Sequence, residues 1–433
     1  MRPILLALPF ACWTAVLAAQ NPPPRALTLK QAMALGRERG VAAALARLNE
    51  RIAEARVGQR RADLLPSVVA AAGAVRQTRN LDEFGIPFAQ GTTDPFTVWS
   101  VQLRASETLF DWSALTRLRA ARDSLAASGA DTRAVGDLAA TAAGLAYLRV
   151  LSAEETVRAR EADSSIAAAL LDQARAQVAA GTSPAIDATR SEVQLAAVRT
   201  QLEVARNQRD RARLDLARAL DLPPETPLHL ADTLVAVPAD LPADPDQAVA
   251  FALDHRPEVA AERARTRVLE QSLRAIGREY LPSLALNGSY QQTGRELDHL
   301  RGTWLVQLQV SAPLLDGFRR PNRQREQEAR LDAARLRLHD TERQVATEAR
   351  QALLDVASAE QQVHLAGERL RLAEQELAQA EERFEAGVAG SVETTAAQGG
   401  LVAARDALIQ ARVAAAVALL QADRALGRSE ALQ

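Results

Sequence analysis

The chain has 433 residues, 52 basic and 54 acidic side chains, a formal net charge of −2 and one cysteine. This balanced charge excludes a nucleic-acid partner held by phosphate neutralisation, and a single cysteine excludes a fold built on disulfides. Alanine, leucine, arginine, glutamate and glutamine dominate, which is typical of long helices.

Residues 1–19 have the features of a secretory signal peptide. Arg2 supplies the positive end, residues 4–17 form an apolar run, and Ala18 and Ala19 are small residues suited to cleavage. Cys12 lies inside this segment, so we expect the exported chain to have no thiol. No run of 18 uninterrupted apolar residues follows, so we expect no membrane-spanning helix.

Residues 20–222 and 246–433 are predicted to be two copies of one structural unit, because short motifs recur in the same order in both. A proline-rich connector, residues 223–245, joins them. Each copy is expected to contain a helix, a β-hairpin, a long helix and a shorter helix. In the first copy these are residues 28–64, 66–108, 112–180 and 184–220; in the second they are residues 245–280, 282–313, 317–386 and 391–426.

The long helix at residues 317–386 is predicted from apolar residues that recur at steps of three and four, with Arg, Glu and Gln between them. At 1.5 Å per residue it would extend on the order of 100 Å. Such a length is typical of a coiled coil, a helical repeat or a membrane-associated bundle.

In the hairpins the apolar period changes from 3.6 to 2. Trp304, Val306 and Leu308 share one face of a predicted strand, and Gln307 and Gln309 share the other. A soluble hairpin packed on a bundle would show this pattern, and so would strands of a membrane β-barrel. The aromatic residues gather around the two hairpins, which favours the barrel.

Four strands are too few to close a barrel, since the smallest bacterial single-chain barrels have about eight. An open edge in lipid would leave backbone groups without hydrogen bonds. The sequence therefore predicts that hairpins from several chains are pooled and that the protein is an oligomer.

No catalytic constellation is present in the sequence. The five histidines are scattered without metal-ligand spacing, and no glycine-rich phosphate loop occurs. We therefore expect no enzyme activity, no cofactor and no metal site.

Three motifs recur in the same order in both copies. Leu-Pro-Ser precedes each hairpin at Pro66 and Pro282, and an apolar-apolar-Asp motif follows each at Asp111 and Asp316. An Ala-Gly turn then leads to an acidic residue, Asp187 or Glu393. With these motifs in this order in both copies, the chain resembles the TolC-type outer membrane efflux proteins.

The resemblance implies a mainly α fold with a small β part. Four strands per chain, twelve in a homotrimer, would form one β-barrel in the outer-membrane lipid, continuous with a long α-helical coiled-coil barrel in the periplasm. The connector and the chain ends would form a belt around the helical barrel.

The implied function is a passive exit duct of a tripartite efflux or type I secretion system. A periplasmic adaptor (membrane fusion protein) would couple it to an inner-membrane pump of the RND, ABC or MFS type. The alternative is a non-channel periplasmic coiled-coil protein with a structural or adaptor role.

The turns at Gly181 and Gly387 have an ordinary explanation as helix ends. Glycine is usual after a helix C-terminus, Ser183 and Ser391 suit helix starts, and an acid in the first turn complements the helix dipole.

The resemblance adds a functional role, in which these turns are the periplasmic tip contacted by the adaptor. Asp187 and Glu393 would line the pore and Phe384 would take part in the closed gate. Ser183 and Ala389 replace the arginine that helps to lock some relatives. We hypothesise that three copies each of Asp187 and Glu393 form a cation-selective constriction, because focused negative charge attracts cations.

Overall fold

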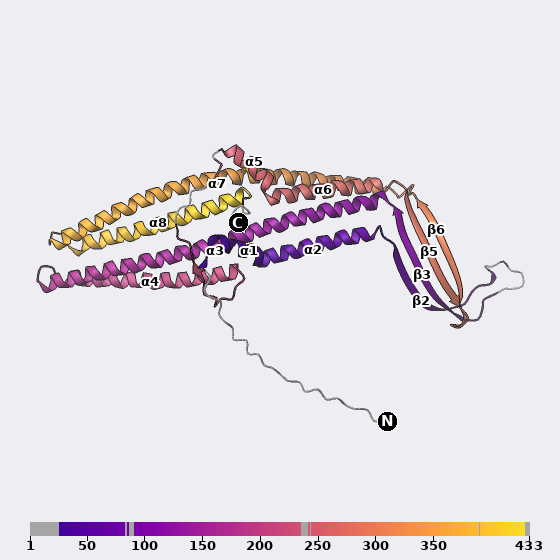
Figure 1. Cartoon of the computed structure of the whole chain (residues 1–433), viewed down its shortest axis with the longest axis horizontal. Coiled ribbons are helices and arrows are strands. Elements are labelled where there is room, and N and C mark those ends of the chain that lie inside the picture. The colour runs from indigo at the N-terminus through magenta and orange to yellow at the C-terminus, as the bar shows by residue number, and fades with distance from the viewer. Residues whose placement is uncertain are drawn as a thin grey trace, which may run out of the picture.

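The computed structural model describes residues 26–82, 85, 91–234, 241–242, 244–388 and 390–428. The predicted signal peptide at residues 1–19, with Cys12, lies outside the described residues, as do Ala389 and part of the connector. The molecule is a long bundle of helices with a small sheet at one end (Figure 1).

Two helices run most of the length of the bundle. They are α3, Trp112–Ala179, and α7, Arg319–Glu385, of 68 and 67 residues. Each turns back into a 35-residue helix, α4 at Ala185–Ala219 and α8 at Ser391–Ala425. The seams between them are rich in buried alanine, including Ala167, Ala380 and Ala404, which lets the helices pack closely.

The helices expected at residues 28–64 and 245–280 are each interrupted, so this prediction was wrong in detail. The first splits into α1, Leu29–Arg39, and α2, Val41–Ala62; the second splits into α5, Pro245–His255, and α6, Pro257–Arg278. Gly40, at φ −51° and ψ 132°, breaks the first helix. Arg256 is extended at ψ 125° because the proline that follows it disfavours a helical conformation.

One four-stranded antiparallel sheet contains both hairpins. Its strands are β2, Ser67–Gln77; β3, Phe96–Phe110; β5, Ser283–Gly294; and β6, Arg301–Ser311. Their order is β2-β3-β5-β6, so the two structural units meet where β3 pairs with β5. Strands β2 and β6 each have only one partner in the described chain and are the edges of the sheet.

The register of the sheet gives it two different faces. Tyr290 pairs with Trp304 and Leu286 pairs with Leu308, and on β3 the apolar face continues with Leu103, the partner of Tyr290. Trp304 is 77% exposed, so this apolar face is open. The opposite face carries mainly polar side chains on β3, β5 and β6, namely Ser100, Gln102, Arg104, Ser106, Asn287, Ser289, Gln291, Gln307 and Gln309.

The first described residues are tied to the connector at the middle of the bundle. Strand β1, Ala26–Leu27, pairs in parallel with β4, His229–Leu230. The fully buried Tyr147 of α3 has its hydroxyl 2.8 Å from the Leu27 carbonyl and 2.9 Å from Oδ2 of Asp232. Burial and Asp232 raise the pKa of Tyr147, so the phenol stays neutral and remains a donor.

Within the described residues, α3 alone is long and apolar enough to cross a membrane. In its most apolar window, however, 61% of the residues are buried inside the protein. A core helix shows such burial, so the apolar composition of α3 is weak support for a membrane span.

Candidate functional site

The two helical hairpins end in turns with the same backbone geometry. Gly181 has φ +75° and Gly387 has φ +69°, a region that favours glycine over residues with a Cβ. The Thr182 amide donates to the Gln177 carbonyl at 3.0 Å, and the Val388 amide donates to the Arg383 carbonyl at 3.0 Å. Each turn is therefore a Schellman motif, which explains the glycine at both positions.

Asp187 lies in the first turn of α4 and is buried, with 5% of its surface exposed. The Ser391 hydroxyl of α8 donates to Oδ1 of Asp187 at 2.6 Å, and the Ser183 hydroxyl donates to Oδ2 at 3.2 Å. An Arg190 nitrogen lies 3.6 Å from Oδ1. The carboxylate therefore joins the tips of the two hairpins.

Glu393 occupies the corresponding place in the second unit but has different surroundings. Its side chain is 45% exposed, and its Oε1 accepts a hydrogen bond at 2.9 Å from Nε of Arg383. The two acids predicted as an equivalent pair are thus not equivalent. Within one chain, Glu393 faces solvent and Asp187 does not.

Phe384 and Ser391 are both buried at the tip. Phe384 is 2% exposed, and its backbone carbonyl accepts a hydrogen bond at 3.1 Å from Nε2 of Gln177 in the other hairpin. Nearby, burial and the charge of Glu385 raise the pKa of Glu381. The backbone of Phe384 therefore lies at the contact between the hairpins, and its side chain is buried within one chain.

A buried ionic cluster farther along the hairpins was missed by sequence reasoning. Asp163 of α3, 1% exposed, accepts from Arg160 at 2.8 Å and from Arg405 of α8 at 2.6 Å. Arg160 also pairs with Asp406 of α8, and the Gln398 amide donates to the Asp163 carbonyl at 3.4 Å. The sequence did contain a signal for this cluster. Arg160 and Asp163 lie on the same helical stripe as Ala167 and Leu170, where apolar residues are expected.

The four residues predicted to mark the barrel turns lie at the ends of strands and helices. Pro66 and Pro282 directly precede β2 and β5. Asp111 caps α3, accepting from the amides of Ser113 at 2.7 Å and Ala114 at 3.1 Å. Asp316 accepts from the Arg320 amide at 3.0 Å; α7 begins at Arg319, two residues after the predicted start.

The chain consists of two copies of one structural unit, with long helices of 68 and 67 residues and one shared sheet that has two different faces. This combination defines the class of channel-tunnel proteins. The chain belongs to the outer membrane efflux protein family, whose profile matches residues 32–221 and 249–428.

Relatives in two bacteria extend over most of the chain. The pyoverdine export outer membrane protein OpmQ of Pseudomonas aeruginosa is 26% identical over 411 residues, which cover 91% of this chain and 83% of OpmQ. The protein CyaE of Bordetella pertussis is 31% identical over 402 residues, covering 89% and 81% of the two chains.

The outer membrane protein VceC of Vibrio cholerae has the same fold. Its structure superimposes with a TM-score of 0.80 at 18% identity, covering 92% of this chain and 96% of VceC.

These comparisons confirm the resemblance inferred from the paired motifs. The protein is an outer membrane efflux channel protein with a periplasmic helical tunnel. The family consists of transport channels rather than enzymes. The alternative of a non-channel periplasmic protein is therefore rejected.

Proposed function

We propose that three copies of this chain assemble into one closed, passive exit duct. The observation that carries this proposal is the sheet, which has two open edges and two unlike faces. In lipid an open edge is too costly, whereas pairing β6 of one copy with β2 of the next satisfies both edges. Three copies would give twelve strands, with the apolar face toward lipid and the polar face toward the lumen.

The helices below the sheet support the same ring. Helix α3 packs against α2 and α6, and α6 packs against α7, so α2 and α7 are the outer helices of this layer. Both carry stripes of large apolar residues that are at least half exposed. Helix α4, in the half of the bundle away from the sheet, carries such a stripe too (Figure 1). The stripes are Val41, Leu45, Leu48 and Ile52 on α2; Leu336, Leu354, Leu365 and Leu372 on α7; and Ile186, Val193, Val204 and Leu214 on α4.

Such an interface is heterologous, because one edge meets the opposite edge of the next copy. Heterologous contacts close into a ring when the rotation between copies allows it. The α2 and α4 edge of one protomer would cover the α7 edge of its neighbour, so the stripes and the strand edges would be buried together.

The helical tips would be the gate and the docking point. A periplasmic adaptor would contact the turns around Gly181, Ser183, Gly387 and Ser391, and an inner-membrane pump would supply the energy. Glu393 is the stronger candidate for a pore-lining acid, because its carboxylate is accessible in the single chain. Asp187 would instead hold the two hairpins of one protomer together.

Planar bilayer recording with the mature protein tests this proposal. We expect discrete ohmic conductance steps of one size, without any nucleotide or second protein. A correctly folded protein that inserts into the bilayer but conducts no current would contradict the duct.

A further inference from the structure

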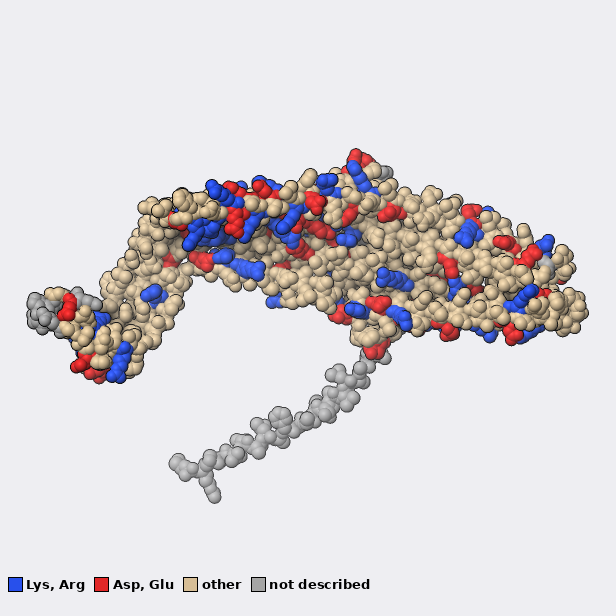
Figure 2. Space-filling view, turned by 180° about the vertical axis from the view of Figure 1, so that it is seen from behind, with Lys and Arg blue, Asp and Glu red and all other residues tan. Residues whose placement is uncertain are grey.

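A basic cavity lies directly below the sheet, where four helices come together. It has a volume of about 500 Å³ and is lined by residues of α2, α3, α6 and α7. Four arginines line it, Arg56, Arg60, Arg117 and Arg323, against one acid, Glu279. Figure 2 shows that charged side chains gather over the helices next to the sheet and are sparse on most of the sheet itself.

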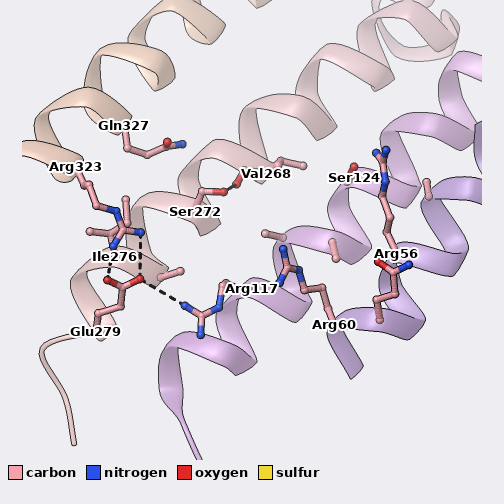
Figure 3. A pocket seen from close by; sticks show the side chains of 15 residues that line it. Arg56, Arg60, Arg117, Ser124, Val268, Ser272, Ile276, Glu279, Arg323 and Gln327 are labelled. Atoms are coloured by element: carbon pink, nitrogen blue, oxygen red, sulfur yellow. Dashed lines mark hydrogen bonds and ion pairs between the residues drawn. The ribbon is translucent and has the colours of Figure 1, made fainter. Parts of the chain in front are cut away.

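Two of these arginines are held in place by the one acid. The nitrogens of Arg323 lie 2.7 and 3.2 Å from the two carboxylate oxygens of Glu279, and a nitrogen of Arg117 lies 3.5 Å from Oε1 (Figure 3). Arg117 also pairs with Asp111 at 3.4 Å. Glu279 therefore fixes two guanidinium groups at one wall of the cavity, and Glu279 and Asp111 together balance their charge.

The opposite wall carries charge that is less compensated. Arg60 pairs with Asp63 at 3.3 Å, and both side chains are about half exposed, so the pair is weak. Arg56 makes no ion pair with any residue of the described ranges. Since each guanidinium offers several donors that match phosphate or carboxylate oxygens, the cavity can surround an oxyanion from two sides.

The position of Trp112 indicates whether the cavity opens toward the lumen of the proposed duct or toward its outer surface. Trp112 is the first residue of α3, two residues after β3 ends; it packs edge-to-face on Phe110 with ring centroids 5.0 Å apart and is 39% exposed. An aromatic residue in this place suits the membrane–water interface on the outside of the duct. Arg117 is five residues farther along α3, about 140° around the helix, and Ala121 is about 180° around, so the cavity faces the lumen.

We propose that this cavity is a binding site, on the lumen side of the duct, for multivalent oxyanions that carry phosphate or carboxylate groups. The inference rests on the proposed duct, because only a closed ring gives the cavity a lumen. Three copies would form a ring of twelve arginines directly below the proposed barrel. Such a ring raises the local concentration of anionic cargo at this level of the duct.

Inorganic pyrophosphate is a suitable probe, titrated calorimetrically at low salt into the mature protein in neutral detergent. We expect saturable binding at one site per protomer. The double variant Arg56→Gln with Arg60→Gln should weaken binding by on the order of tenfold or more, because it removes charge-assisted hydrogen bonds. Glu279→Gln should strengthen binding, since it removes the competing carboxylate.

The matched control is Arg51→Gln with Arg61→Gln, which removes two charges from the same helix outside the cavity. This control should bind pyrophosphate nearly as the wild type does. Equal weakening by both double variants would show non-specific electrostatic attraction of pyrophosphate and would overturn the proposed site. A wild type without saturable binding would also overturn it.

Bilayer recording separates a lumen site from one that holds a lipid headgroup on the outer surface. Pyrophosphate should reduce the wild-type current and should have little effect on Arg56→Gln with Arg60→Gln. Binding that leaves the current unchanged would assign the phosphate to the lipid-facing side and overturn the lumen site, while the duct itself would stand. A wild type that conducts no current would overturn the duct, and the lumen assignment with it.

Discussion

The hydroxyl of Ser391 donates a hydrogen bond to Oδ1 of Asp187 at 2.6 Å, across 204 residues of sequence. Both residues are buried, and they belong to different helical hairpins of the same protomer. The bond therefore connects the two structural units at the end of the molecule proposed to open and close.

Ser391→Ala should loosen the tip. It leaves a buried carboxylate without its donor from the other hairpin, at a cost of about 1–3 kcal/mol. We expect more frequent openings in bilayer recordings. Ser183→Ala is the control, because Ser183 donates to Asp187 from the same hairpin. If both variants open equally often, the link between hairpins has no special role.

Glu393→Gln should reduce cation selectivity, because it removes an accessible carboxylate that would be repeated three times in the ring. The reversal potential in a salt gradient measures this directly. Glu203→Gln is the control, because Glu203 is an exposed acid on α4 away from the tip. An unchanged reversal potential for Glu393→Gln would exclude Glu393 as a selectivity residue.

Asp163→Asn should destabilise the contact between α3 and α8. The change leaves Arg160 and Arg405 without their buried partner, and breaking such a pair costs about 3–5 kcal/mol. Thermal unfolding of the detergent-extracted protein measures the loss. Arg371→Gln, which breaks an exposed pair with Glu368, should change stability by less than about 1 kcal/mol. Equal losses in both variants would contradict the role of burial.

Tyr147→Phe should weaken the attachment of the N-terminal strand at the belt. It removes a buried hydroxyl that contacts Leu27 and Asp232, which costs about 1–3 kcal/mol. Faster protease cleavage near Leu27 and a lower unfolding temperature are expected. Tyr280→Phe is the control, because this ring is 47% exposed and no hydrogen bond of its hydroxyl is found in the described chain. Protection of the strand as in the wild type would contradict the prediction.

Two glycine substitutions should change stability in opposite directions. Gly387→Ala places a Cβ at φ +69° and should cost about 1–2 kcal/mol. Gly399→Ala lies within α8 with nothing within 4 Å of the new Cβ, so it should stabilise the helix by about 0.5–1 kcal/mol. Thermal unfolding of the two variants gives the sign of each change in stability. A stabilising Gly387→Ala would contradict the turn geometry.

The long elements of the fold were predictable because their signals are local and repeated. The amphipathic period predicted α7 to within two residues of its start at Arg319, and the strict alternation around Trp304 predicted β6. The breaks at Gly40 and Arg256 were missed because the apolar period continues across them, and a glycine or an X-Pro step alone does not decide between a kink and a break.

The candidate site was less predictable, because its contacts join residues far apart in the chain. The sequence singled out Asp187 as an acid after a glycine turn, but its hydrogen-bond donor Ser391 belongs to the other unit. The same holds for Asp163 and Arg405, and for Tyr147 and Asp232. Only the three-dimensional packing shows that Asp187 is internal within the chain and that Glu393 is accessible.

The native mass of the mature protein tests whether three chains close into one duct. It is measured after extraction by detergent from the outer-membrane fraction and is corrected for bound detergent. We expect a mass of three processed chains, because the sheet edges β2 and β6 and the apolar stripes of α2, α4 and α7 are covered only in a closed ring. A stable monomer of one processed chain would leave those edges open and would contradict the duct.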